Sequence, residues 1–93
     1  MVVAVLTLYL RLPMAASLKD KRAILRSLTA RIRNKFPVSV AEVDAQDAHQ
    51  SAVLAVACIA ANCALADSIL DQLIALVEKG EHAQLCDILR EYR

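Results

Sequence analysis

Apolar and polar positions at the start of the chain predict a β-strand. Residues 2–12, VVAVLTLYLRL, are rich in β-branched, aromatic and aliphatic side chains and are followed by Pro13, which has no backbone donor. Both alternating faces of this segment are largely apolar, as in a strand at the centre of a sheet. We therefore predict a central strand, in which Val5 and Tyr9 face away from the helices if Leu6 faces toward them.

From Ser17 onward the apolar spacing changes to the 3.6-residue period of an α-helix. Ser17 followed three residues later by Asp20 is typical of a capping box, with Asp in place of Glu. The apolar side chains that follow lie within one arc of the helix: Leu18, Leu25, Leu28, Ile32 and Phe36. We predict a helix over residues 18–35 that stops before Pro37, with Phe36 in the core.

The next two apolar segments differ in pattern. Residues 38–45 are more polar and alternate, which favours an edge strand, and residues 46–50 form a connecting loop. Residues 52–61 are continuously apolar, and at this length the pattern favours a strand buried on both faces. Together they predict a hairpin of one edge strand and one central strand.

A second helix and a last strand complete the chain. Asn62 is the expected N-cap and Gly80 the expected C-terminal stop. Residues 84–93 alternate weakly and are assigned to a strand. The stripe predicted to be buried in the second helix is Leu65, Ile69, Leu73, Leu76 and Val77.

The predicted order is therefore β-α-β-β-α-β, the ferredoxin-like split β-α-β arrangement. We expect one α+β domain over residues 1–93, with an antiparallel sheet and two helices on one face. The other face of the sheet is then open and apolar. An exposed apolar face is unfavourable for a small domain, so we expect it to pair with a second copy in a homodimer. The alternative is a monomer with a modestly apolar face.

Composition supports one folded domain and reveals an uneven distribution of charge. The 93 residues are 58% hydrophobic and include one glycine, which excludes disordered chains and glycine-rich nucleotide loops.

The net charge of +1 hides two halves of opposite charge. Residues 1–41 hold eight basic residues and one acidic residue, a net charge of +7. Residues 42–93 hold three basic residues and nine acidic residues, a net charge of −6. The first half therefore favours an anionic partner.

Compartment and cofactors are predicted from what the chain contains. The apolar N-terminal segment lacks a basic flank and a cleavage pattern and is too short to span a bilayer, so we expect no membrane association. An odd number of cysteines without a C-x-x-C pair favours a reduced, cytoplasmic setting. We expect no cofactor and no metal site, with free, buried thiols at Cys58, Cys63 and Cys86.

The most distinctive candidate for binding is a row of basic residues on the first helix. Lys19, Arg22, Arg26 and Arg33 fall in one stripe beside its apolar arc, which we call the basic ridge. Arginine guanidinium groups pair well with phosphate oxygens, so the ridge favours contact with a nucleic-acid backbone. Two alternatives are a solvated face, with or without pairing to the acidic half, and a docking surface for an acidic protein.

Lys21 and the loop at residues 46–50 are further candidates. Lys21 lies in the apolar arc, so its ammonium must snorkel out or meet a carboxylate such as Glu42 or Asp44, and a structural ion pair is favoured over a catalytic lysine. Asp47 and His49 have the residue types of an acid–base pair. No nucleophile accompanies them, so we favour a turn in which Asp47 bonds to the backbone. We expect no catalytic residue.

Three segments together resemble the YlxP-like family of small, uncharacterised bacterial proteins: SLKDKR (17–22), RIRNKFPVSVAEVD (31–44) and QDAHQSAVLAVA (46–57). The resemblance covers essentially the whole chain. It implies a cytoplasmic ferredoxin-like domain with no established catalytic activity, in a family whose members are often encoded among translation and ribosome-maturation genes. Where members commonly carry Trp, this chain has His49. The family motif positions, all of unknown role, map onto Ser17, Leu18, Lys19, Lys21, Arg22, Gln46 and Asp47.

The sequence thus leads to a binding protein rather than an enzyme. We expect a module associated with ribosomal RNA, or with a ribosome-associated protein, through the basic ridge. Single-stranded RNA usually requires aromatic stacking platforms, and Tyr9 is the one candidate on the sheet. The alternative is a homodimeric structural or protein-interaction domain with no nucleic-acid role.

Overall fold

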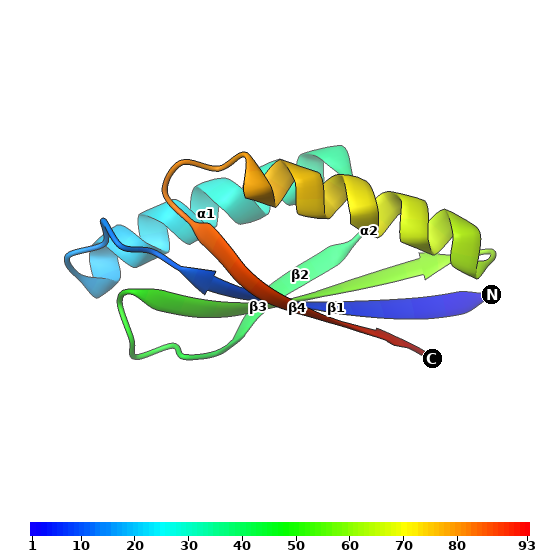
Figure 1. Ribbon diagram of the computed structural model, residues 1–93, viewed down its shortest axis with the longest axis horizontal. Helices are drawn as coiled ribbons and strands as arrows, with labels where there is room; N and C mark the ends of the chain where they lie inside the picture. Colours follow the sequence, from blue (N-terminus) through cyan, green and yellow to red (C-terminus); the bar gives the residue numbers. More distant parts are fainter.

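Two helices and four strands alternate along the chain in the predicted order. The computed structural model describes all 93 residues, with elements β1 (Val2–Arg11), α1 (Leu18–Lys35), β2 (Ser39–Asp44), β3 (Ser51–Ala60), α2 (Cys63–Glu78) and β4 (Gln84–Tyr92). The strands form one antiparallel sheet in the order β2-β3-β1-β4, and both helices cover the same face (Figure 1). The predicted ferredoxin-like α+β fold is confirmed.

The core lies between the sheet and the helices, because strand alternation and helix periodicity direct their apolar sides to the same layer. In β1, Leu6 and Leu8 are fully buried there, whereas Tyr9 is exposed on the opposite face. In α1, Leu28 and Ile32 are buried against the sheet. The central position predicted for β1 is confirmed, because β1 pairs with β3 on one side and β4 on the other.

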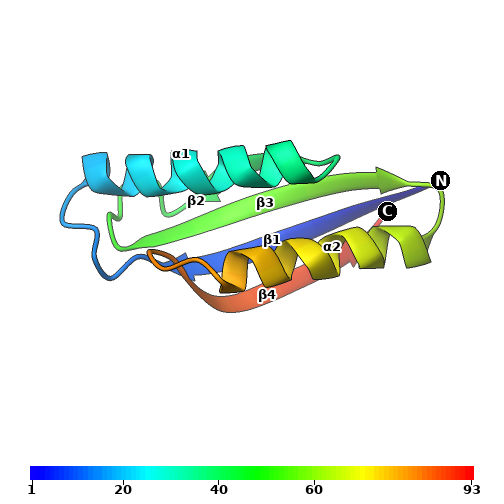
Figure 2. The same cartoon turned by 90° about the horizontal axis from the view of Figure 1, so that it is seen from above.

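The two helices run in opposite directions above the sheet (Figure 2). Helix α1 packs near β2, at one edge of the sheet, whereas α2 packs over β1, β3 and β4. The outer flank of α1 therefore adjoins an edge strand, and its inner flank faces α2. No helix of the chain is both long enough and apolar enough to cross a bilayer.

The buried stripe of α2 differs from the prediction. Leu73 and Val77 are buried as expected, but Ala66 and Leu70 complete the stripe. Leu65 is 48% exposed, and Ile69 and Leu76 are only half-buried because they lie on the side of α2 that faces α1. Apolar side chains cover more than one side of this helix, so spacing did not distinguish the side that meets the sheet.

Gly80 follows α2 but does not cap it in the left-handed conformation. The helix ends at Glu78, Lys79 is its C-cap, and no glycine has a positive φ. The N–H of Gly80 donates to the carbonyl oxygen of Val77 at 3.0 Å, and an added Cβ would lie 3.2 Å from that oxygen. Glycine is favoured here because the turn brings two backbone segments close together.

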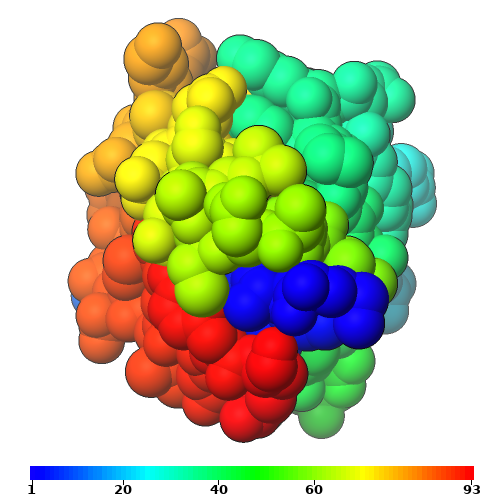
Figure 3. Space-filling view, turned by 90° about the vertical axis from the view of Figure 1, so that its right-hand side faces the viewer, coloured from blue at the N-terminus to red at the C-terminus, as the bar shows by residue number.

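The last strand, the weakest pattern in the sequence, is confirmed. It pairs along β1, with a bulge between Tyr9 and Leu10. Val3 and Arg93 exchange two backbone hydrogen bonds, of 3.2 and 2.7 Å. Figure 3 shows the resulting contact between the N-terminal and C-terminal segments at one end of the molecule.

The three cysteines do not share one environment. All are free thiols, but only Cys58 is buried, whereas Cys63 and Cys86 are exposed. Burial raises the pKa of the Cys58 thiol. The prediction of buried thiols is therefore correct for Cys58 and wrong for the other two, which lie at the start of α2 and in an edge strand.

Candidate nucleic-acid interface

Helix α1 carries the basic ridge, and its start is defined by side-chain caps. Ser17 Oγ accepts a hydrogen bond from the backbone N–H of Asp20 at 3.1 Å, as the capping pattern predicts. The Asp20 carboxylate accepts in turn from the N–H of Ala16 at 3.0 Å. The family motif position Ser17 thus has a structural role, because it fixes the residue at which the helix begins.

The basic ridge lies along the outer flank of α1, next to β2. All four of its side chains are exposed. Arg22, Arg26 and Arg33 line a shallow groove of about 260 Å³ whose other wall includes Val40 and Ala41 of β2. Lys19 extends the row toward the N-terminal end of the helix. The structure therefore keeps the four residues in one row on one side of the molecule.

None of the four ridge residues forms an ion pair within the chain. The ion pairs of the structure are Lys21 with Glu42, Arg90 with Asp67 and Asp71, and Arg93 with Glu91. Arg33 donates one hydrogen bond, of 2.7 Å, to the carbonyl oxygen of Val40, which holds its guanidinium over the edge strand. Pairing of the ridge with the acidic half of the same molecule is contradicted.

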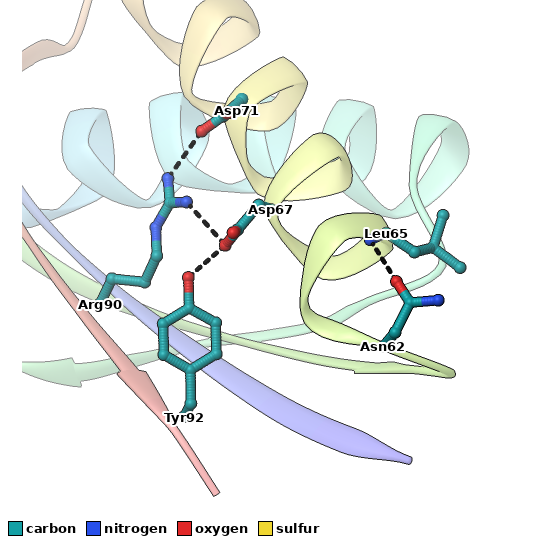
Figure 4. Close-up of polar contacts among 6 residues, drawn as sticks. All are labelled: Asn62, Leu65, Asp67, Asp71, Arg90 and Tyr92. Carbon is teal, nitrogen blue, oxygen red and sulfur yellow. Dashed lines mark hydrogen bonds and ion pairs between the residues drawn. The ribbon is translucent and has the colours of Figure 1, made fainter.

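Two acidic residues of α2 contact side chains of β4 instead. Arg90 pairs with Asp67 at 3.2 Å and with Asp71 at 2.9 Å, and the Tyr92 hydroxyl donates to Asp67 (Figure 4). The hydrogen bond to Asp67 is the main reason that the pKa of Tyr92 is raised above its ordinary value. These contacts lie at the β4 edge of the sheet, opposite the edge at which the ridge lies.

Lys21 is buried and satisfied, as the ion-pair prediction requires. Its side chain is 2% exposed, and Nζ lies 2.7 Å from Glu42 Oε2. Nζ also donates to the carbonyl oxygens of Ala45 at 2.6 Å and Ala48 at 2.7 Å. The contact with Glu42 is a charge pair without hydrogen-bond geometry, since Oε2 accepts no hydrogen bond. Lys21 therefore ties α1 to β2 and to the following loop.

The loop at residues 46–50 does not assemble a site around its polar residues. Gln46 Nε2 donates to the carbonyl oxygen of Glu42 at 3.5 Å, whereas Asp47 and His49 are exposed and make no hydrogen bond. The expected backbone contact of Asp47 is wrong. Asp44 makes such a contact, accepting from the N–H of Ala45 at 2.7 Å, because the chain turns there, with Ala45 at a φ of 58°.

A second group of cations, which the sequence pattern did not bring together, lies on the inner flank of α1. Arg31 and Lys35 line a groove of about 360 Å³ between the helices, and Lys79 lies on its α2 side with Gln72. Arg31 and Lys35 are four residues apart and therefore share one side of α1, but no spacing in the sequence links Lys79 to them. Its place depends on the antiparallel packing of the helices, which local spacing does not encode.

The open face of the sheet lies away from both helices. By strand register its side chains include Val5, Thr7, Ala55, Ala57 and Leu89 at the centre. Charged residues occupy its margins: Arg11, Asp44, Asp87 and Glu91. Tyr9, 38% exposed, belongs to this face, so the aromatic platform and the basic ridge lie on opposite sides of the sheet and do not form one site.

The fold and the charged helix define a class of protein: a small ferredoxin-like domain with a basic helical surface and an open apolar sheet. The family model "Protein of unknown function (DUF503)" matches residues 3–90, and the chain belongs to this family. It is similar to the "Uncharacterized protein YlxP" of Bacillus subtilis (strain 168), with 33% identity over 64 residues, which are 69% of this chain and 70% of that protein. The predicted YlxP-like resemblance is thereby confirmed.

Proposed function

We propose that the protein is a non-enzymatic binding module that contacts RNA phosphates through the basic ridge, on ribosomal RNA or within a ribosome-associated complex. The observation that carries the proposal is the row of four exposed cations with no internal counter-ion: Lys19, Arg22, Arg26 and Arg33.

The physical argument rests on the cost of grouping like charges. Four cations on one flank of a helix repel one another, and none of them forms an ion pair with a carboxylate of this chain. Glu42, which lines the same groove, is paired with Lys21. A phosphate backbone offsets it and releases condensed counter-ions on binding. Three of the four are arginines, whose guanidinium groups donate in pairs to phosphate oxygens. This arrangement favours a polyanion over a single small anion.

The test is the salt dependence of binding to ribosomal RNA fragments. We expect log affinity to fall linearly with log salt concentration. The double variant Arg22→Gln/Arg26→Gln should reduce the magnitude of the slope by about 2, one unit for each lost phosphate contact, at every RNA sequence tested. Arg11→Gln is the matched control, because Arg11 is an exposed arginine on the open sheet face.

Undetectable binding of the wild-type protein at low ionic strength, or binding that does not change with salt, would contradict the proposal. An equal effect of Arg11→Gln and the ridge variant would show a response to net charge rather than to the ridge.

A second function, self-association through the open sheet face, is favoured by a separate observation. The face is apolar at its centre and charged at its margins, the distribution found in protein interfaces. Ile59 is 66% exposed there, and Leu89 is also exposed. Strands about 4.8 Å apart with a rise of about 3.3 Å per residue give this face an area of about 600 Å². Since a standard interface buries about 800 Å² per partner, the area approaches what a stable dimer needs.

The shape of the open face also supports a homodimer. Small side chains of β2 and β3, Ala41, Ala55 and Ala57, leave a hollow of about 250 Å³ beside Val5. Larger side chains stand on the other half of the face, including Leu89 of β4. A two-fold axis along the boundary between β1 and β3 places the raised half of each copy on the hollow half of the other, as an isologous interface requires.

Sedimentation at micromolar concentration tests this second function. We expect a dimer for the wild-type protein and a monomer for Val5→Asp and Ile59→Asp, because each places a charge in the interface. Ala75→Asp, on the exposed side of α2, is the control and should leave the dimer intact. A wild-type protein that sediments as a monomer would exclude this function and leave the RNA proposal standing.

A further inference from the structure

From Ala23 onward, the side of α1 that points away from the sheet carries small side chains without charge. Its residues are small and exposed: Ala23, Ser27, Ala30 and Asn34. They lie opposite the buried side chains Leu25, Leu28 and Ile32, since each helical residue advances about 100°. We call these four residues the crest of α1. Small side chains along a crest allow another surface to approach the helix closely.

Cations stand on both sides of this crest. The basic ridge occupies the flank toward β2, where Arg22 and Arg26 line the outer groove. Arg31 and Lys35 occupy the flank toward α2, where Lys79 joins them across the inner groove. We call these three residues the inner cations. None of the three forms an ion pair within the chain. Helix α1 and Lys79 thus present two rows of positive charge, one on each flank of α1.

Two rows of cations match two rows of phosphates. A helix with its side chains is about 10–12 Å across, so the two flanks are too far apart to follow one phosphate backbone. A duplex presents two backbones on either side of a groove. Single strands are usually held by one basic groove together with aromatic platforms. Here Tyr9 lies on the far side of the sheet, and the hydroxyl of Tyr92 is hydrogen-bonded to Asp67, so neither tyrosine adjoins α1.

The position of α1 in the molecule selects the kind of groove. Both helices lie on the same face of the sheet, side by side (Figures 1 and 2). Because α2 flanks α1, the crest cannot enter a groove about 8.5 Å deep, such as the major groove of B-DNA. The minor groove of A-form RNA is wide and shallow and displays 2′-hydroxyl groups. Ser27 and Asn34 place polar side chains on the crest, where such hydroxyls can be met.

We propose that the ligand of this surface is double-stranded RNA, with the crest of α1 on the minor groove, the basic ridge on one backbone and the inner cations on the other. This inference rests on the proposed RNA-binding function and specifies its ligand. The acidic residues of α2 agree with the orientation, because Asp67 and Asp71 face β4 rather than α1. A duplex centred on α1 therefore stays clear of these two carboxylates. Of those nearer to α1, Glu42 in the outer groove is paired with Lys21, and Glu81 lines a pocket with Arg31 and Ser27.

The test compares two double variants on three nucleic acids in fluorescence anisotropy titrations at about 0.1 M salt. The nucleic acids are an RNA duplex of about 16 base pairs, one of its strands alone, and a DNA duplex of the same sequence. Arg31→Gln/Lys79→Gln removes cations from the inner flank. Arg22→Gln/Arg26→Gln removes them from the ridge, and Arg11→Gln is the control on the opposite face.

We expect the inner-flank variant to lose at least about tenfold in affinity for the RNA duplex and less than about twofold for the single strand. The ridge variant should have a lower affinity for both the RNA duplex and the single strand. Ala30→Gln, which adds bulk but no charge to the crest, should weaken duplex binding and spare the single strand. Chemical unfolding of each variant establishes that the fold is retained.

Other outcomes separate the two proposals. If the inner-flank variant binds the RNA duplex like wild type while the ridge variant is weakened, this inference is overturned and the proposed function stands. Equal affinity for the DNA duplex and the RNA duplex would overturn the assignment to an A-form minor groove. If the wild-type protein binds none of the three at low salt, the proposed function fails, and this inference with it.

Discussion

At the scale of single residues, Lys21 shows how a charge is accommodated in an apolar layer. Its ammonium group has three partners, the carboxylate of Glu42 and the carbonyl oxygens of Ala45 and Ala48. Each partner compensates part of the cost of removing the charge from water. Because the three belong to β2 and the loop after it, one side chain of α1 organises the chain reversal between β2 and β3.

Removal of this ammonium should destabilise the fold strongly. We expect Lys21→Met to lower the free energy of unfolding by about 3 kcal/mol, because it leaves a partly buried carboxylate and two carbonyl groups without partners. Urea denaturation provides the measurement. Lys19→Met is the matched control, since Lys19 is exposed two positions away, and it should change stability by less than about 0.5 kcal/mol. Similar losses in the two variants would contradict this role.

Tyr92 gives a second prediction, on pH. Its pKa is raised from the ordinary value of 10.0, chiefly by the hydrogen bond to Asp67. A group whose pKa is higher in the folded state contributes stability below its unfolded pKa, and that contribution is lost as the pH rises through the folded pKa. Ultraviolet titration in a Tyr9→Phe background isolates Tyr92. The midpoint should lie above 10 and should fall when Asp67→Asn is added; an unchanged midpoint would contradict the contact.

At the scale of elements, α1 shows how local sequence sets the limits of a helix. Ser17 satisfies the N–H of Asp20 at one end, and at the other Phe36 turns to an extended conformation ahead of Pro37. Between these signals the polar residues sort into two charged flanks and a neutral crest. The element is therefore specified locally, both in its length and in the angular positions of its charges.

The N-cap gives the matching prediction. Ser17→Ala should lower the free energy of unfolding by about 1 kcal/mol, because the N–H of Asp20 loses its acceptor. Ser27→Ala is the control: it makes the same chemical change in the exposed middle of α1, where alanine is the better helix former. In thermal or urea unfolding, the Ser17→Ala variant should be clearly less stable than the Ser27→Ala variant. Equal stabilities would show that the cap contributes nothing.

At the scale of the whole molecule, the sheet separates two surfaces of different character. The helical face carries the basic ridge and the inner cations, and the open face carries apolar side chains inside a charged margin. The two proposed interfaces therefore do not overlap. If two copies pair through their open faces, their helical layers become the outer layers of the dimer, and the two α1 helices face away from each other.

This geometry predicts the stoichiometry of the complex. A wild-type dimer should bind two short RNA duplexes, one on each outer layer, and Val5→Asp should bind one duplex per monomer with an unchanged affinity per site. Calorimetry combined with sedimentation measures both quantities. One duplex per dimer, or loss of RNA binding in the monomeric variant, would show that the two surfaces depend on each other.

The sequence predicted the fold well where one pattern was dominant. The bounds of α1 and the central positions of β1 and β3 followed from periodicity and from the length of apolar runs. It failed at α2, where Leu65 was assigned to the core in place of Leu70. That helix is apolar on the side that faces α1 as well as on the side that faces the sheet. Spacing alone therefore could not show which side is buried.

For the candidate site, the sequence by itself determined which residues share a flank of α1, because the angles around a helix depend only on residue number. It also determined that Lys21 needs a carboxylate, because its angle places it in the core. Only the tertiary structure decided that Asp67 and Asp71 pair with Arg90 rather than with the ridge, and that Lys79 joins Arg31 and Lys35. These contacts join residues far apart in the chain, so they depend on strand order and helix packing.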